Sequence, residues 1–252
     1  MGRYPQKSDS HGSLKDLQVA INEKKKYFDG EISKVIGKQM NIDWKSPLET
    51  DDYAEYRDKD FLIRLGLNKM KYPLSDFWPN NGPQWDALGV SDDEIILVEA
   101  KANIPEIVSP GTSAKNPESI NKISISFDKV KKYLNISNDI DWTGTFYQYV
   151  NRIAHLYYLR EKNDIKAYLL FIYFINDITV HGPKTKDEWL GVIQVMECYL
   201  GLDKKHKLRK YIHDIFIDIS DLRYKNATGT VLLGQQFNYF FLNNKRGHIT
   251  FS

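Results

Sequence analysis

The sequence predicts a single α/β domain in which a mixed central sheet is flanked by helices. Apolar runs of strand length alternate along the chain with longer segments whose apolar residues recur at helical spacing. The apolar run at 95–98 has hydrophobic side chains on both faces, which is typical of a strand buried in the middle of a sheet. With 252 residues, 42% of them hydrophobic, the chain is long enough to form one sizeable core.

Before this central run the sequence predicts two helices and one strand. The elements expected are, in chain order, a disordered lead-in at 1–12, a helix over 13–37 that Gly30 kinks or divides, a helix from Ser46 to about Arg64 and a strand over 72–78. The second helix rests on a start pattern in which Ser46 is the N-cap, Pro47 follows it and Glu49 occupies the capping-box position. Because residues 1–12 are expected to be disordered, the single domain is expected to begin at residue 13.

After the central run the sequence predicts three helices and two strands. They are a helix beginning at 117, an amphipathic helix over 146–161, a buried strand over 166–177, a helix over 185–200 and a strand over 211–219. The remaining residues, 226–252, form a C-terminal extension of the domain. This extension fits an edge hairpin, a dimer surface or a lid equally well, which leaves a homodimer open.

The segment from Asn80 to Glu106 reads as two short strands joined by an acidic turn. A turn at Asp92 and Asp93 gives a register that pairs Val90 with Ile95, Leu88 with Leu97, Asp86 with Glu99, and Gln84 with Lys101. Directly opposed residues share a face of the sheet, with Cβ atoms roughly 4.5–5.5 Å apart. This register therefore brings two carboxylates side by side with an ammonium group next to them.

The paired carboxylates of Asp86 and Glu99 create an electrostatic tension. At ~5 Å and an effective dielectric of about 20, two full negative charges repel each other by on the order of 3 kcal/mol. Either one carboxyl group takes up a proton or a cation lies between the two. Mg²⁺ suits such a site because it prefers oxygen ligands and often uses only one or two carboxylates. The backbone carbonyl of Ala100 offers a further oxygen, and Lys101 can position a water or stabilise charge on a phosphate.

Asp86, followed thirteen residues later by Glu99, Ala100 and Lys101 at the end of an apolar strand, resembles the motif of the PD-(D/E)xK nuclease superfamily. The resemblance implies a restriction-endonuclease-like fold, in a bacterial branch of that superfamily, and hydrolysis of DNA or RNA that depends on Mg²⁺ or Mn²⁺. In that family the Asp and the Glu bind the metal and the Lys helps to activate or orient the attacking water. The matching residues here are Asp86, Glu99 and Lys101, while Trp85 stands where the family usually has a proline.

The resemblance also implies an additional acidic ligand outside the hairpin. The family core usually has a helix before the hairpin, which sometimes carries a further metal-binding carboxylate. Glu55 is the candidate in this sequence, and Glu31 and Glu49 are the alternatives.

Four residues are expected to bind the substrate. Some relatives carry a glutamine on the helix after the catalytic strands, with a tyrosine four residues later; here Gln148 is followed at that spacing by Arg152. Gln148, Arg152 and His155 share a polar helix face that contains no acidic residue, which suits a phosphate backbone. Gln84, which the predicted register pairs with Lys101, completes the set.

Two other interpretations of the carboxylate pair stay open. In the first, the pair belongs to a structural ion cluster, and the protein is a catalytically silent module that binds nucleic acid or another protein. In the second, the two carboxylates hydrolyse a glycoside without a metal, since retaining glycosidases need carboxyl groups about 5–5.5 Å apart.

Composition excludes several other classes of function. The single cysteine excludes an intrachain disulfide and a site of several cysteines, and neither a Walker-type loop nor a Gly-x-Ser-x-Gly elbow is present. No run of eighteen apolar residues occurs, so no membrane span is expected and a cytoplasmic location is the default. A nucleic-acid partner, expected to be DNA, has to be recognised by local basic patches because the net charge is only +2. The densest patches are at 24–26 and 204–210.

Overall fold

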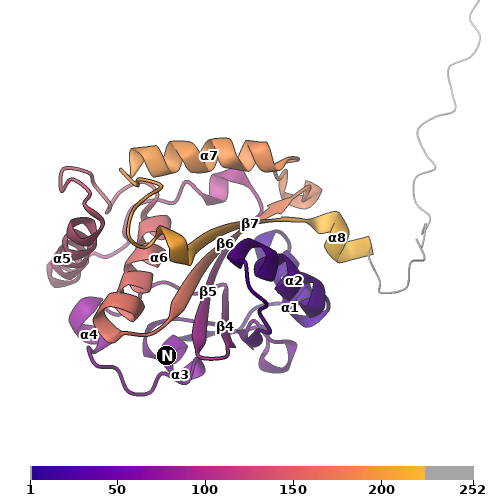
Figure 1. Cartoon of the computed structure of the whole chain (residues 1–252), viewed down its shortest axis with the longest axis horizontal. Coiled ribbons are helices and arrows are strands. Elements are labelled where there is room, and N and C mark those ends of the chain that lie inside the picture. The colour runs from indigo at the N-terminus through magenta and orange to yellow at the C-terminus, as the bar shows by residue number, and fades with distance from the viewer. Residues whose placement is uncertain (1, 225–252) are drawn as a thin grey trace, which may run out of the picture.

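The computed structural model describes residues 2–224, which form three layers with a five-stranded sheet between two groups of helices (Figure 1). The strands of this sheet are β2 (Asp43–Ser46), β4 (Ala87–Ser91), β5 (Glu94–Lys101), β6 (Ala167–Ile175) and β7 (Ile212–Asp218). A separate small sheet pairs β1 (Arg3–Tyr4) with β3 (Glu55–Tyr56). The predicted single α/β domain with a mixed sheet flanked by helices is confirmed.

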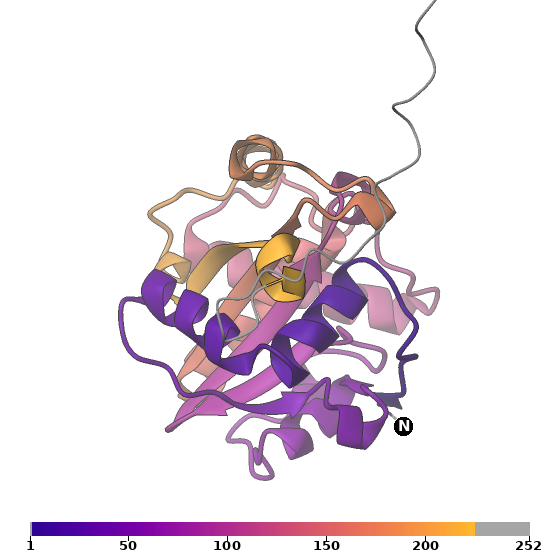
Figure 2. The ribbon, with the colours of Figure 1, turned by 90° about the vertical axis from the view of Figure 1, so that its right-hand side faces the viewer.

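Two groups of helices cover the two faces of the sheet. One face packs against α1 (Ser13–Asn22), α2 (Lys25–Ile36) and α8 (Ile219–Tyr224), and Figure 2 shows α1 and α2 lying across it. The other face packs against α3 (Asp58–Arg64), α4 (Leu74–Phe77), α5 (Pro117–Leu134), α6 (Tyr147–Tyr157) and α7 (Lys186–Tyr199). Helix α6 continues directly into η3 (Tyr158–Lys162), a short π-helix. Single 3₁₀ turns occur at η1 (Glu49–Asp51), η2 (Ile104–Glu106), η4 (Ile178–Val180) and η5 (Arg209–Tyr211).

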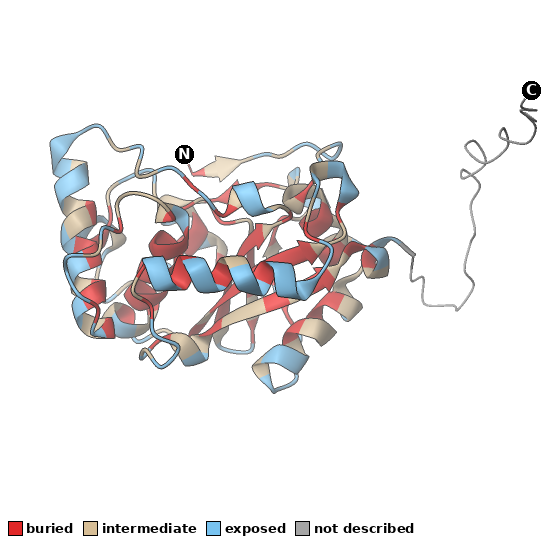
Figure 3. Cartoon of the chain, turned by 90° about the horizontal axis from the view of Figure 1, so that it is seen from above, coloured by how far each residue is buried: buried red, intermediate tan, exposed pale blue. Residues whose placement is uncertain are grey.

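The sheet is mixed, and β5 lies at its centre. The strand order is β2-β4-β5-β6-β7, in which β2, β4 and β5 are antiparallel neighbours and β5, β6 and β7 are parallel ones. Because β5 has a strand on both sides and helices on both faces, its side chains at 95–98 are all buried, and Figure 3 colours the central strands accordingly. The apolar run therefore follows from the position of this strand in the sheet.

Alternation of side chains along the strands divides the core into two parts. Leu88, Leu97 and Phe171 point to the face covered by α3–α7, whereas Ile96 and Val98 point to the face covered by α1, α2 and α8. Glu99 and Lys101 follow Leu97 at intervals of two residues. They are therefore directed to the first of these faces, beneath α6.

The edge strand β2 is held by close contacts with its neighbours. Trp44 pairs with Gly89 of β4, where an added Cβ atom would lie 2.5 Å from the Cγ2 atom of Ile42. Asp29 of α2 accepts hydrogen bonds from the indole nitrogen of Trp44 at 3.0 Å and from the backbone N–H of Ile42 at 3.2 Å. The close contact with Ile42 explains why residue 89 is a glycine, and the hydrogen bonds to Asp29 attach β2 to α2.

The elements predicted after the hairpin are confirmed. The structure has α5, α6, β6, α7 and β7 where the sequence predicts a helix, a helix, a strand, a helix and a strand. Asn116 and Thr185 act as N-caps by accepting hydrogen bonds from the backbone N–H groups of Glu118 and Glu188, respectively. The extension at 226–252 and its assignment to a hairpin, dimer surface or lid lie outside the described residues.

Several predictions for the N-terminal third are wrong. The helix over 13–37 is divided at residues 23–24, while Gly30 lies inside α2. The helix expected from Ser46 to Arg64 is replaced by the end of β2, η1, β3 and the short α3, and the strand expected at 72–78 is the helix α4. Ser46 ends β2 opposite Leu88, because pairing between strands prevails over its local helix-start pattern.

The segment expected to be a disordered lead-in is ordered from residue 2 onward. Strand β1 pairs with β3, and the guanidinium group of Arg3 forms an ion pair with Asp51 at 2.9 Å. The backbone N–H of Gln6 donates a hydrogen bond to the carbonyl of Asp52. All of these partners lie about fifty residues away in sequence, so no local pattern indicates them.

Within residues 2–224 no helix is both long and apolar enough to cross a membrane.

A buried acidic pair links α1 to the loop after β6. Asp16 and Asp177 are 2% and 0% exposed, and one oxygen of each carboxyl group accepts no hydrogen bond within the described part of the chain. Arg223 of α8 donates to Asp16 at 3.2 Å and lies 3.8 Å from Asp177. Burial first, and then the charge of Asp177, raise the pKa of Asp16 to about 7, although Arg223 opposes the shift. One arginine is thus shared by two buried carboxyl groups.

We expect Asp16→Asn to flatten the dependence of stability on pH between about 4 and 7. The pKa of Asp16 is higher in the folded than in the unfolded chain, so protonation stabilises the fold at low pH and this contribution is lost as the pH rises through about 7. The amide of asparagine does not titrate, so the variant loses this pH-dependent part of the free energy of unfolding. At 1.36 kcal/mol per pKa unit it amounts to on the order of 1–4 kcal/mol. Chemical unfolding at a series of pH values measures the free energy of unfolding of each variant. The exposed Asp139→Asn is the control, and parallel profiles for Asp16→Asn and wild type would contradict the expectation.

Candidate active site

The hairpin formed by β4 and β5 has the predicted turn and register. Asp92 and Asp93 form the turn, and Val90 pairs with Ile95 as expected. Regular pairing ends where Ala87 pairs with Val98, so the predicted pairs Asp86–Glu99 and Gln84–Lys101 lie beyond the ladder, and Trp85 pairs with Tyr56 of β3. The Oδ2 atom of Asp86 accepts a hydrogen bond from the backbone N–H of Ala100 at 2.7 Å. The side chain of Asp86 is therefore fixed against the carboxyl end of β5.

Glu99 is enclosed between two cations. Only 3% of Glu99 is exposed, and its Oε1 atom accepts a hydrogen bond from the Nζ atom of Lys101 at 2.6 Å. Its Oε2 atom accepts another from the Nε atom of Arg152 at 2.7 Å. Arg152, itself 5% exposed, also donates to the carbonyl of Gln84 at 2.8 Å and lies 5.0 Å from the ring centre of Trp85. Arg152 thus lies in the cluster, where it binds Glu99 and Gln84, and its expected role in substrate binding stays a prediction.

Gln148 joins the cluster from the start of α6. Its Oε1 atom accepts a hydrogen bond from the Nζ atom of Lys101 at 3.2 Å. The backbone N–H of Gln148 donates to the hydroxyl oxygen of Ser109 at 3.0 Å, so the loop after β5 fixes the first turn of the helix. The structure therefore brings together Gln148 and Lys101, which the sequence assigned to substrate binding and catalysis, respectively.

Glu55 is the third carboxylate of the cluster. It is 6% exposed and lies on β3, not on a helix as expected. Its Oε2 atom accepts hydrogen bonds from the side-chain amides of Gln84 and Gln6, the latter at 3.0 Å. The two alternatives lie elsewhere, since Glu31 pairs with Lys34 on α2 and Glu49 is exposed on η1.

The charges of the cluster act differently on its three carboxyl groups. Burial, and then the charges of Glu99 and Glu55, raise the pKa of Asp86 well above its ordinary value. Burial also raises the pKa of Glu55, although the hydrogen bonds from the side-chain amides of Gln84 and Gln6 oppose this shift. Burial works in the same direction on Glu99, but the charges of Arg152 and Lys101 outweigh it and hold the pKa of Glu99 below its ordinary value.

Lys101 remains an ammonium ion in this environment. Burial works to lower its pKa, but the charges of Glu99 and Asp86 prevail and raise that pKa above the ordinary value of a lysine. The tension between the carboxylates is thus relieved in two ways: Glu99 is paired with cations, and Asp86 tends to hold a proton.

His155 lies in the core and not in the cluster, which corrects the expectation that it binds substrate. It is 1% exposed, and its Nδ1 atom lies 3.0 Å from the carbonyl oxygen of Asn151. The imidazole packs among the rings of Phe61, Phe77, Trp78 and Trp85. Burial lowers the pKa of His155 to about 3, so the side chain is a neutral part of the aromatic core.

The cluster offers oxygen donors for a hard cation. Among residues 2–224 no three His, Cys, Asp or Glu side chains are grouped so as to hold a metal ion, but Mg²⁺ commonly uses only one or two carboxylates and keeps several waters. The Oδ1 atom of Asp86 and the Oε1 atom of Glu55 accept no hydrogen bond within the described residues, and neither is sealed from solvent. Because both carboxyl groups have raised pKa values, a cation beside them would relieve repulsion. The donor chemistry of Asp86 and Glu55 therefore fits Mg²⁺ or Mn²⁺.

Comparisons with known protein families, with curated proteins and with solved structures found no match.

Two residues that the sequence analysis did not single out support the cluster. Gln6 binds Glu55 from the N-terminal segment, and Ser109 binds the first turn of α6. Gln6 lies in a polar stretch without periodicity, so the sequence contains no signal for it. Ser109 lies in the loop between η2 and α5, for which the sequence predicts no helix or strand.

We expect Glu99→Gln to destabilise the fold strongly, because it leaves Arg152 and Lys101 buried without a carboxylate. Removing one partner of a buried ion pair costs about 3–5 kcal/mol, and each kcal/mol lowers the melting temperature of a domain of this size by roughly 2–4 °C. Thermal unfolding should therefore shift down by about 6–20 °C.

The matched control for this experiment is Asp93→Asn, which breaks an exposed ion pair with Lys166 at the other end of the same strand. Such a surface pair contributes about 1 kcal/mol or less. A Glu99→Gln variant as stable as the Asp93→Asn control would show that the cations around Glu99 do not depend on its charge.

Proposed function

We propose that the protein is a metal-dependent nuclease with a restriction-endonuclease-like fold, which hydrolyses phosphodiester bonds in DNA or, alternatively, RNA. The observation that carries the proposal is the convergence of Asp86, Glu99 and Lys101 at one end of the β4–β5 hairpin. The mixed sheet and the sequence motif support it. The glycoside alternative is not favoured, because a retaining glycosidase needs one carboxylate as a nucleophile, and both oxygens of Glu99 are already engaged by Lys101 and Arg152.

The proposed metal ligands are Asp86 and Glu55 through their free oxygens. Glu99, which the family motif implies as a ligand, and the backbone carbonyl of Ala100 are the further donors. When bound, Mg²⁺ or Mn²⁺ supplies a Lewis acid for the phosphate and lowers the pKa of a bound water. The proton that Asp86 tends to hold has to leave before it can serve as a ligand, so metal binding is expected to release protons.

Lys101 is proposed to act as a hydrogen-bond donor and not as a general base. Its raised pKa keeps it protonated at neutral pH, so it cannot accept a proton from water. Its contacts with Glu99 and Gln148 fix the ammonium group, which can then donate to a phosphate oxygen or to the attacking water. Fixed donors of this kind stabilise charge that develops in the transition state.

We expect Asp86→Asn and Lys101→Met each to reduce metal-dependent cleavage by at least about 100-fold, the scale observed when one preorganised group is removed. The assay is cleavage of single- and double-stranded DNA and RNA, linear and circular, in the presence of Mg²⁺ or Mn²⁺. Asp86→Asn should retain or raise the melting temperature, because asparagine resembles the neutral acid that burial favours.

The matched controls are Asp93→Asn and Lys166→Met, which change the same residue types in an exposed ion pair at the opposite end of β5. Both should cleave like wild type. The assignment of the site fails if Asp86→Asn cleaves as fast as Asp93→Asn, and EDTA-resistant cleavage would exclude the metal.

The second candidate function is that of a catalytically silent module that binds nucleic acid or another protein. It is favoured by one observation: both oxygens of Glu99 are already bound by cations of the protein itself, Lys101 and Arg152. A cluster that supplies its own cations does not need a metal to be stable.

Calorimetric titration with Mn²⁺ separates these two functions. For the nuclease we expect binding at millimolar Mn²⁺ or tighter, accompanied by proton release, and we expect Asp86→Asn to abolish it because the amide is a weaker ligand. Comparison of buffers with different ionisation enthalpies measures the protons released. Absence of Mn²⁺ binding by the folded wild-type protein would favour the silent module.

A further inference from the structure

A basic pocket of about 630 Å³ lies at the amino end of β7, in the loop that follows α7. Its lining includes four lysines, Lys204, Lys205, Lys207 and Lys210, all of them exposed. These belong to one of the two basic segments that stand out in the sequence. The structure shows that the segment is folded around a concave surface and does not lie along one face of a helix.

The four lysines of this pocket carry charge that the protein does not neutralise. None of them forms an ion pair within the described part of the chain, although the lining also contains Glu161. The pocket's arginine, Arg209, is neutralised by Glu197 at 3.4 Å and Asp214 at 3.0 Å. Burial lowers the pKa of His206 to about 4, so its imidazole adds no charge at neutral pH. Among the described residues, the pocket therefore presents four lysines without an ion-pair partner against one carboxylate in its lining, Glu161.

Aromatic rings are interleaved with these lysines. The Nζ atom of Lys207 lies 4.7 Å from the ring centre of Tyr133, and that of Lys210 lies 4.8 Å from the ring centre of Tyr211. The guanidinium group of Arg160 also packs on the Tyr211 ring, with its Cζ atom 3.2 Å from the ring centre. Tyr133 in turn packs against Tyr157, with ring centres 5.2 Å apart. Lysines held over tyrosine rings in a groove are typical of surfaces that bind nucleic-acid strands.

The pocket is separate from the carboxylate cluster. Lys101 pairs with Tyr173 near the carboxyl end of β6, whereas β7 begins at Ile212, which pairs with Leu169. From Tyr173 to Leu169 is four residues along β6, or roughly 13 Å, and from β5 to β7 is two strand spacings, or about 10 Å. The two sites therefore lie toward opposite ends of the parallel strands.

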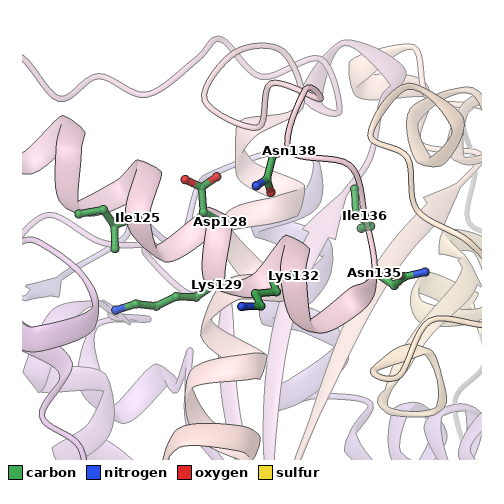
Figure 4. A pocket seen from close by; sticks show the side chains of 7 residues that line it. All are labelled: Ile125, Asp128, Lys129, Lys132, Asn135, Ile136 and Asn138. Carbon is green, nitrogen blue, oxygen red and sulfur yellow. The ribbon is translucent and has the colours of Figure 1, made fainter.

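A second hollow, over the outer side of α5, differs in charge from the basic pocket. Its lining combines Asp128 with Lys129 and Lys132 and includes two isoleucines (Figure 4). Asp128 also forms an ion pair with Lys131 at 3.1 Å. Within residues 2–224 this hollow has two lysines without an ion-pair partner, Lys129 and Lys132, whereas the basic pocket has four.

We propose that the pocket lined by Lys204, Lys205, Lys207 and Lys210 binds the phosphate backbone of a nucleic-acid strand, independently of the carboxylate cluster. Lysine binds phosphate oxygens as a point charge, and four of them match several successive phosphates of one strand. The Tyr133 and Tyr211 rings lie beside Lys207 and Lys210 and help to hold these ammonium groups at the pocket.

The chemistry of the pocket disfavours other anionic partners. A membrane surface would require apolar side chains beside the lysines, and none of the exposed large hydrophobic side chains among the described residues belongs to 203–211. An acidic protein is best bound by bidentate arginines, but Arg209 is committed to Glu197 and Asp214. Free lysines interleaved with tyrosines favour nucleic acid.

The test is the binding of short labelled strands and duplexes of DNA and RNA, measured by fluorescence anisotropy in EDTA at several salt concentrations. Four lysine–phosphate contacts predict a slope of log K against log salt of about −2.8 for single strands and about −3.6 for duplexes. The double variant Lys205→Gln/Lys207→Gln should reduce the magnitude of this slope by about 1.4–1.8 and weaken binding about 10- to 30-fold near physiological salt.

The matched control is Lys34→Gln/Lys45→Gln, which changes the net charge equally but removes lysines already paired with Glu31 and Asp43. It should bind within about twofold of wild type, since no free ammonium group is lost. Equal losses in the two double variants, no binding by wild type, or displacement of nucleic acid by polyglutamate at equal charge would overturn the proposal. Because EDTA prevents metal-dependent cleavage, the result does not depend on whether the protein is a nuclease.

Discussion

The candidate site depends on the pairing of the buried Glu99 carboxylate with Lys101 and Arg152. Taking three charged groups out of water is costly, and the cost is offset only when every charge has a close partner. Here each oxygen of Glu99 receives a hydrogen bond from a different cation, at 2.6 and 2.7 Å. Lys101 comes from the same strand and Arg152 from α6. The ion cluster therefore also fixes how the helix lies on the sheet.

The position of Glu99 follows from the architecture of the sheet. Strand β5 is central and buried on both faces until it reaches its carboxyl end, where Glu99 and Lys101 point beneath the start of α6. Parallel pairing with β6 places Phe171 beside Glu99, and Tyr149 of α6 stacks on Phe171 with ring centres 4.4 Å apart. Apolar stacking thus brings α6 close enough for Arg152 to reach the carboxylate.

Local sequence patterns predict the hairpin well because all the residues that determine its turn and register lie within about twenty residues of one another. Two apolar runs and an acidic turn determine the register, and the register determines which carboxylates meet. The resemblance implies Glu55 as a site residue, but its place on β3 was not predicted, because that strand forms by pairing with β1, about fifty residues earlier, and with Trp85. Periodicity misplaced His155 for a related reason. The polar face of α6 was expected to meet solvent, whereas tryptophans and phenylalanines from other segments cover part of it.

The two ways in which the cluster manages negative charge have opposite consequences. Glu99 is stabilised by cations of the protein itself, so its ionisation contributes to the fold. Asp86 has only the backbone N–H of Ala100 as a hydrogen-bond donor among the described residues, and Glu99 and Glu55 repel its charge, so its ionisation opposes folding. A carboxyl group that is costly to ionise in a folded protein favours whatever cation relieves that cost. The energetic strain at Asp86, more than the stable ion pairs of Glu99, is therefore the physical argument for a metal at this site.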